Sequence, residues 1–317
     1  MNRIGMNNLL AAIMVIITVC FVSCRHKELC DEKIFVADVK VVFDWKKSPD
    51  AHVETMRVYL FPADGGKALL YEFADIQGGR ITVPTGNYKA LCINSDTDSL
   101  LYRNMDLYAT FEVYSLDGSM NAATYAAFNQ DEFPAGRVSL SPDRFYTDRI
   151  EEIRLEITEN EQTIRFFPEE QTCRYRIEIR NVSNLQYVAA GWVTGGLSGM
   201  SVGRFLGENQ LDAESAIIPF EMYSDGVSTL RTEFLTFGGY SLKQTHKVVV
   251  HVVMPDGNDK YYIYDVSEQI HTAPNPRDVY IILDGLPLPK PIVPGGGFHT
   301  TVDNWESIDV DLSLIHI

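Results

Sequence analysis

Apolar and polar residues alternate with a period of two along much of this chain, and this pattern sets its class of fold. The alternation places apolar side chains on one face of an extended strand and polar side chains on the other, which predicts half-buried β-strands. Residues 248–254 are apolar on both faces apart from His251, as in a central strand. Helical periodicity is scarce, and we expect one short helix at residues 121–128. The alternating segments lie at residues 39–45, 56–60, 153–157 and 174–180.

Gly, Pro, Asn and Asp punctuate these short strands, which predicts an all-β fold made of β-sandwiches. The polar segment Glu159-Asn160-Glu161 separates two strand-rich halves. We therefore expect an N-terminal sandwich over residues 36–160 and a C-terminal sandwich over residues 161–286. The segment Pro255–Asp259 predicts a hairpin turn between two strands of the second half.

The last part of the chain, residues 287–317, reads as a linker followed by one more strand. Residues 287–297 hold four prolines and three glycines, so the linker begins stiff and ends flexible. An isolated strand with one apolar face must join a sheet edge, either in its own domain or in a second subunit. The candidate donor strand has its apolar face at Ile308, Val310, Leu312 and Leu314.

The N-terminus predicts export and lipid attachment. Residues 9–22 are apolar apart from Thr18 and Cys20, and Arg3 precedes them. At a helical rise of ~1.5 Å these residues span roughly 21 Å, short of a ~30 Å hydrocarbon core, which favours a signal peptide over a permanent membrane helix. The sequence Phe21-Val22-Ser23-Cys24 fits a lipobox. We expect a signal peptide at residues 1–23, a lipidated Cys24 that carries palmitate, and a tether at residues 24–35.

Composition excludes some partners and leaves the cysteines ambiguous. The formal net charge of −16 disfavours nucleic acid and anionic headgroups. Beyond the signal peptide and Cys24 there remain Cys30, Cys92 and Cys173, without the paired spacing of a zinc site. Cys92 lies in an apolar strand pattern and reads as a small buried residue. One disulfide among the three stays open.

Several segments together resemble the fimbrillin-like lipoproteins of Bacteroidales, close to the anchor-type subunits of type V fimbriae. These segments are Cys24–Cys30, Val39–Trp45, Met56–Pro62, Val83–Leu91 and Leu197–Ser201. The resemblance implies two transthyretin-like β-sandwiches in tandem, attachment to the outer membrane through lipid, and assembly with other fimbrillin-like subunits by strand exchange. Polymerising members are cut after an Arg or Lys near the N-terminus. No such site stands out here, which favours an anchor or accessory role.

The matches to catalytic and metal-binding motifs in this sequence are incomplete. Gly199-Met200-Ser201-Val202-Gly203 matches G-x-S-x-G, but no helix pattern follows, so we interpret it as a turn between strands. The segment 94–98 lacks the glycine and distal Glu of a calcium loop and reads as a polar turn. His246 and His251 would fall on opposite faces of one strand. We expect no enzyme activity, no metal and no cofactor.

An aromatic surface gives a second hypothesis, a glycan-binding lipoprotein of a polysaccharide-uptake system. A sugar ring stacks on exposed aromatic side chains, and several lie within one loop-rich stretch. The candidate residues are Tyr102, Tyr108, Tyr114, Tyr125 and Phe128. The fimbrial hypothesis needs a strand-accepting groove instead, so the three-dimensional arrangement of these side chains discriminates between the two.

Overall fold

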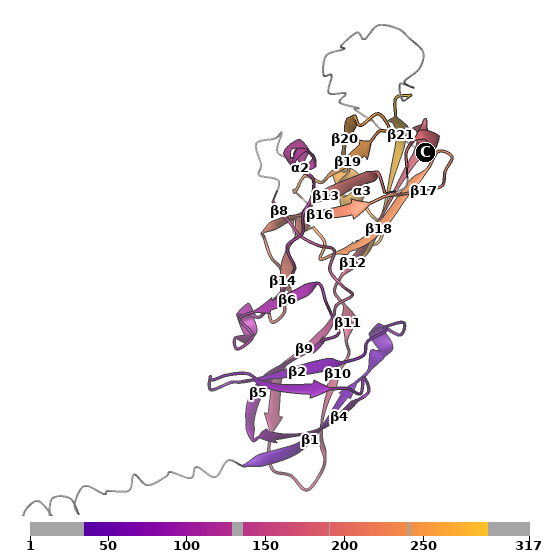
Figure 1. Cartoon of the computed structure of the whole chain (residues 1–317). Coiled ribbons are helices and arrows are strands. Elements are labelled where there is room, and N and C mark those ends of the chain that lie inside the picture. Colours follow the sequence, from indigo (N-terminus) through magenta and orange to yellow (C-terminus); the bar gives the residue numbers. More distant parts are fainter. Residues whose placement is uncertain (1–34, 129–135, 190, 240, 242, 291–317) are drawn as a thin grey trace, which may run out of the picture.

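The protein is an elongated stack of β-sheets, with β1 near one end and β17 and β20 near the other (Figure 1). A computed structural model describes residues 35–128, 136–189, 191–239, 241 and 243–290. Within these residues the strands form five sheets, and the α-helices are α2 (Ala122–Phe128) and α3 (Ser267–His271). Three short 3₁₀ helices are η1 (Trp45–Lys47), η2 (Tyr108–Thr110) and η3 (Leu185–Tyr187). The predicted all-β sandwich fold is confirmed.

Two sheets pack face to face to form the N-terminal sandwich. One has the order β10 (Gln162–Phe166), β1 (Val36–Phe43), β4 (Gly78–Pro84). The other has the order β11 (Glu169–Glu170), β9 (Tyr146–Leu155), β5 (Gly86–Asn94), β2 (Met56–Pro62), β3 (Leu69–Phe73). Alternate residues of both sheets meet in one buried apolar cluster, as the period-two pattern predicts.

The C-terminal sandwich repeats this two-layer arrangement. Its first sheet has the order β17 (Tyr223–Ser224), β18 (Leu230–Thr236), β12 (Cys173–Ser183), β21 (Asp278–Pro287). Its second has the order β20 (Asp259–Asp265), β19 (Lys247–Val253), β13 (Val193–Ser201), β16 (Ser215–Glu221), β8 (Arg137–Val138). Strand β19 is buried on both faces, as expected of residues 248–254. The predicted hairpin after it is also present, because β19 pairs with β20 in antiparallel register.

The fifth sheet has four short strands and joins the two halves of the chain, and we call it the bridging sheet. Its order is β15 (Gln210–Leu211), β14 (Gly203–Phe205), β7 (Glu112–Ser115), β6 (Leu100–Arg103). Strands β6 and β7 come from the first half of the sequence and β14 and β15 from the second. Its apolar face covers the outer face of β2 and β5, so these two strands are buried on both sides.

The strand pairing differs from the predicted division at residues 160 and 161. Strands β10 and β11 follow that point, yet they belong to the N-terminal sandwich. The segment Glu159–Glu161 returns the chain from β9 in one sheet to β10 in the other, where β10 pairs in parallel with β1. A polar turn within one sandwich therefore cannot be told from a linker between two sandwiches by its composition.

Candidate functional site

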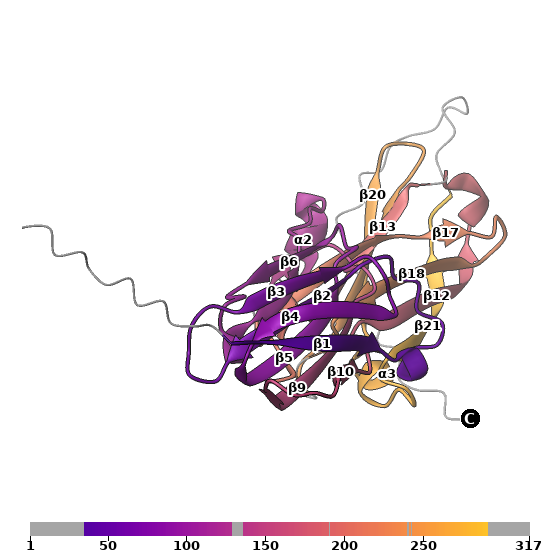
Figure 2. The same ribbon diagram turned by 90° about the horizontal axis from the view of Figure 1, so that it is seen from below.

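The first described strand, β1, lies in the middle of its sheet. It runs parallel to β10, from Val39 opposite Gln162 to Phe43 opposite Phe166, and antiparallel to β4 on its other side (Figure 2). The side chains on its inner face, Ala37, Val39, Val41 and Phe43, are each at most 3% exposed. Strand β1 therefore fills a groove whose walls are β10 and β4.

Aromatic packing and a close backbone approach fix the end of β1. The Phe43 ring stacks on Phe166 at 6.0 Å and meets the edge of Phe73 at 5.4 Å. Opposite it, Gly78 has φ +114°, and a Cβ there would lie 2.1 Å from the carbonyl oxygen of Val41. Only glycine fits this position, because it tolerates positive φ and has no side chain to clash.

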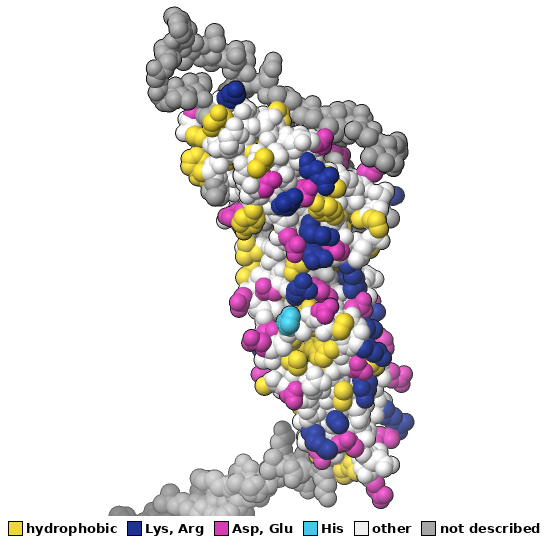
Figure 3. Space-filling view, turned by 90° about the vertical axis from the view of Figure 1, so that its right-hand side faces the viewer, with side chains coloured by type: hydrophobic (Ala, Val, Ile, Leu, Met, Phe, Trp, Pro, Cys, Tyr) yellow, Lys and Arg dark blue, Asp and Glu magenta, His cyan; other side chains and the backbone are white. Residues whose placement is uncertain are grey.

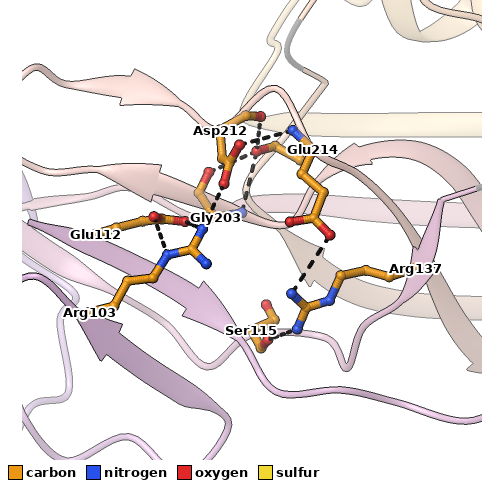
Figure 4. Close-up of polar contacts among 8 residues, drawn as sticks. Arg103, Glu112, Ser115, Arg137, Gly203, Asp212 and Glu214 are labelled. Carbon is orange, nitrogen blue, oxygen red and sulfur yellow. Dashed lines mark hydrogen bonds and ion pairs between the residues drawn. The ribbon is translucent and has the colours of Figure 1, made fainter. Parts of the chain in front are cut away.

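The two halves of the molecule are also joined by a charged network in the bridging sheet (Figure 4). Arg103 donates two hydrogen bonds to Glu112, of 2.6 and 2.8 Å, and lies 3.3 Å from Asp212. The Glu112 side chain is 1% exposed. Burial raises the pKa of Glu112, and the Arg103 guanidinium opposes this shift. Residues about one hundred positions apart thus form one ion cluster around the buried Glu112.

A second arginine completes this network. Arg137 contacts Glu214 at 3.9 Å and donates to the carbonyl oxygen of Ser115 at 3.4 Å. The guanidinium groups of Arg137 and Arg103 lie 5.8 and 5.1 Å from the centre of the Tyr114 ring. No periodic signal in the sequence identifies this network, because each residue gains its role only from a distant partner.

Ser201 of the G-x-S-x-G motif supports the same junction. Its hydroxyl oxygen lies 2.7 Å from the carbonyl oxygens of Gly203 and Asp212, and the residue is 1% exposed. The motif, which we interpret from the sequence as a turn between strands, ends β13 and begins β14 in the structure, with a single bend residue, Val202, between them. The hydroxyl is engaged by backbone and is not presented at a surface.

The residues predicted to carry attachment and strand donation lie outside the described part of the chain. These are Cys24 and the donor-strand residues Ile308, Val310, Leu312 and Leu314. The last described strand, β21, is an edge strand that pairs only with β12 among the described strands. One position on its free edge is filled by Gln269, whose amide accepts from the N–H of Ile282 at 2.9 Å and donates to its carbonyl oxygen at 3.1 Å.

The polar turn and the histidines lie apart from one another. In the turn, Asp96 accepts a hydrogen bond from the Glu54 N–H at 2.8 Å, so its carboxylate serves the local backbone. His246 packs against His271 with ring centres 5.1 Å apart, whereas His251 stacks on Tyr261 at 4.6 Å. Within the described ranges, no group of three or more His, Cys, Asp or Glu is arranged to hold a metal ion.

Cys92 is buried as predicted. It is 0% exposed, and burial raises the pKa of its thiol well above the ordinary value. Cys173 is a free thiol as well, while Cys30 is outside the described residues. Among the described helices, none is long and apolar enough to span a bilayer.

The aromatic side chains proposed as a sugar-stacking surface do not gather in one place. Tyr102 and Tyr108 pack into the apolar cluster under the bridging sheet, and Tyr114 lies beneath the two arginines described above. Tyr125 and Phe128 belong to α2, where they pack on the C-terminal sandwich. Strand pairing separates these residues, although they are close in sequence.

Comparison with known proteins identifies related chains. One relative, a protein of Bacteroides ovatus described as the fimbrium anchoring subunit Fim4B, is 23% identical over 338 residues, which cover 96% of each chain. The fold resembles that of a protein from Bacteroides ovatus described as an adhesin, with a TM-score of 0.63, 21% identity, and coverage of 81% of this chain and 95% of that one.

A second solved structure has a similar fold. It is a protein of Bacteroides thetaiotaomicron described as polysaccharide binding, with a TM-score of 0.52 and 10% identity. The match covers 78% of this chain and 90% of that one. A family model, described as a domain of unknown function, DUF5119, matches residues 23–221. The match spans more than half of the sequence, so the chain belongs to the DUF5119 family.

Proposed function

We propose that this protein is a fimbrium-associated structural subunit, anchored to the outer membrane through a lipid on Cys24 and joined to other fimbrillin-like subunits by strand exchange. The relative described as a fimbrium anchoring subunit, aligned over 96% of both chains, supports this role. The adhesin-like fold and the burial of Ser201 favour a mechanical over an enzymatic role.

The observation that carries the proposal is the occupied groove of β1. A strand inserted between β10 and β4 would have to displace β1, with its four buried apolar side chains and its pairing to both neighbours. A subunit that keeps its own N-terminal strand in this groove is closed to a donor there. Such a subunit can stand at one end of a chain of subunits. It cannot stand in the middle of a chain in which each subunit accepts a strand in this groove.

The position of β1 also suits a base subunit. The tether at residues 24–35 directly precedes β1, so a lipid on Cys24 would hold this end of the molecule at the membrane. Twelve extended residues reach at most about 40 Å. The end with β17 and β20 would then face away from the membrane (Figure 1). The C-terminal segment with Ile308, Val310, Leu312 and Leu314 would be the donor, because alternate apolar side chains fill the pockets of an accepting groove.

Lipid attachment is tested by labelling cells with a radioactive or clickable palmitate analogue and recovering the protein. We expect label on the wild-type chain and on Cys20→Ser, and none on Cys24→Ser. Cys20 is the matched control because it lies only four residues before Cys24. Label on Cys24→Ser would contradict the anchor assignment.

Strand donation is tested by mild crosslinking on the outer membrane of the native host, followed by pull-down of this protein. We expect other fimbrillin-like subunits to be recovered with the wild-type chain. They should be lost when Ile308, Val310, Leu312 and Leu314 are changed to Ser. The control changes the polar face of the same segment to Ala, at Ser307, Asp309, Asp311 and Ser313. Recovery of the protein alone would refute the fimbrial role.

A further inference from the structure

A single row of side chains crosses the outer face of the C-terminal sandwich near its free end. Strand register places Glu221 of β16 opposite Thr194 of β13, Thr194 opposite His251 of β19, and His251 opposite Tyr261 of β20. Residues on this face alternate with those that enter the core, such as Phe220 and Val250. The row is therefore aligned by the same pairing that builds the sheet.

In the next row toward the middle of the sheet, a glycine leaves room for α2 to pack beside the polar row. Gly196 has no side chain, and a Cβ there would lie 2.9 Å from Met120 Cε and 3.2 Å from Phe128 Cζ. Helix α2 can therefore pack directly on β13 and β19. Asn121 caps this helix by accepting from the Ala123 N–H at 2.8 Å. The helix start is thus held fixed next to the polar row.

Together these elements enclose a pocket of about 520 Å³. Its floor is the row Glu221–Thr194–His251, one wall is the α2 side with Met120 and Thr124, and the opposite rim is Trp192, whose residue is 39% exposed. The pocket combines one large aromatic face with convergent polar groups.

The polar groups of this pocket are only partly satisfied. Thr194 Oγ1 lies 3.3 Å from His251 Nδ1, and His251 Nε2 lies 3.2 Å from Asp259. Asp259 is half exposed, so its carboxylate is also open to solvent.

We infer that this pocket binds a neutral saccharide. The exposed Trp192 side chain suits the apolar face of a sugar ring, and the Thr194 and Glu221 oxygens suit its hydroxyls. None of the described residues that line the pocket is Lys or Arg, so an anionic sugar or phosphate lacks a counter-charge. This site is distinct from the β1 groove and does not depend on strand exchange.

The inference is tested by isothermal titration calorimetry on a chain from residue 24 with Cys24→Ser, which retains every described residue. The probes are maltotriose, cellotriose and mannotriose as neutral oligosaccharides, and trigalacturonate as the anionic counterpart. We expect at least one neutral probe to bind and trigalacturonate to give no heat. Trp192→Ala should weaken that binding about tenfold through loss of ring contact. Glu221→Gln, at an exposed position that leaves the core intact, should weaken it as well.

Tyr187→Ala is the matched control, because Tyr187 is an exposed aromatic residue on the C-terminal sandwich that does not line the pocket. Circular dichroism checks that each variant keeps its fold. The inference is overturned if no neutral probe binds up to its solubility limit, or if Trp192→Ala and Glu221→Gln bind as tightly as Tyr187→Ala. It is also overturned if trigalacturonate, or a short peptide with one aromatic side chain, binds in place of the neutral sugars.

Discussion

At the scale of single residues, the absence of a side chain at Gly78 allows β1 to pack closely against β4. Changing Gly78 to Ala places a methyl group against the Val41 carbonyl oxygen and strains a backbone with φ +114°. We expect the free energy of unfolding to fall by roughly 3 kcal/mol. Gly66 has a similar φ of +116° but open space around its Cβ, so Gly66→Ala should cost only about 1 kcal/mol. Chemical denaturation measures both values. Equal losses would mean that the close approach to β1 contributes nothing.

Glu178 makes a residue-scale prediction about pH. It accepts hydrogen bonds from Tyr280 at 2.5 Å, Arg180 at 2.5 Å and Arg231 at 2.9 Å. Basic and acidic side chains are interleaved on the face of the molecule shown in Figure 3. The Tyr280 hydroxyl first, and then the two arginines, lower the pKa of Glu178 to about 2. The ordinary value is 4.5. A carboxyl with a lowered pKa stabilises the fold above its ordinary value and loses this contribution as pH falls toward the folded value.

We therefore expect Glu178→Gln to be less stable than the wild type at neutral pH. The difference in unfolding free energy should shrink as pH falls from about 4.5 toward 2, because the wild-type carboxyl becomes protonated. Glu233→Gln, at an exposed position on the neighbouring strand β18, is the control. A difference that stays constant across this pH range would contradict the assignment of the shift to Glu178.

At the scale of secondary-structure elements, the sequence predicts strands that are long and buried on one face. Strand β1 alternates cleanly, β12 alternates only from Arg174 to Ile177, β19 is apolar on both faces, and α2 occupies residues 122–128 within the predicted 121–128. The bridging sheet could not be predicted, because its strands hold only two to four residues each and pair across about ninety positions. Ile157, expected on the inner face of a strand, lies beyond the end of β9 and is 64% exposed.

The groove of β1 supplies the prediction at this scale. A chain that begins at Trp45 lacks β1 and exposes the backbone edges of β4 and β10 and the apolar core that β1 covers. We expect it to melt at a lower temperature than the full chain, and a peptide of residues 35–44 added in excess should restore stability by mass action. A peptide with Val41→Asp, whose buried side chain is 1% exposed, should not. Thermal unfolding followed by circular dichroism measures this. Rescue by both peptides would mean that the groove does not select apolar side chains.

At the scale of the whole molecule, the bridging sheet connects the two sandwiches. Strand β7 pairs with β14, and β8 pairs with β16, so each contact joins one half of the sequence to the other. The Ser141 hydroxyl also contacts both the N–H and the carbonyl oxygen of Leu235. A structural subunit that transmits force from one end to the other needs such a junction, because a free hinge would let the sandwiches bend independently.

The junction predicts one cooperative unfolding transition for the wild-type chain. Arg103→Ala leaves Glu112 buried beside Asp212 without its cation, and should weaken the junction by about 2 kcal/mol, less than for a fully buried pair because Arg103 is itself 45% exposed. Arg57→Ala breaks a solvent-exposed pair with Glu72 and should change little. In differential scanning calorimetry we expect Arg103→Ala to broaden or split the transition, while Arg57→Ala leaves it single. Two well-separated transitions in the wild type would instead mean that the sandwiches unfold independently and that the bridging sheet does not couple them.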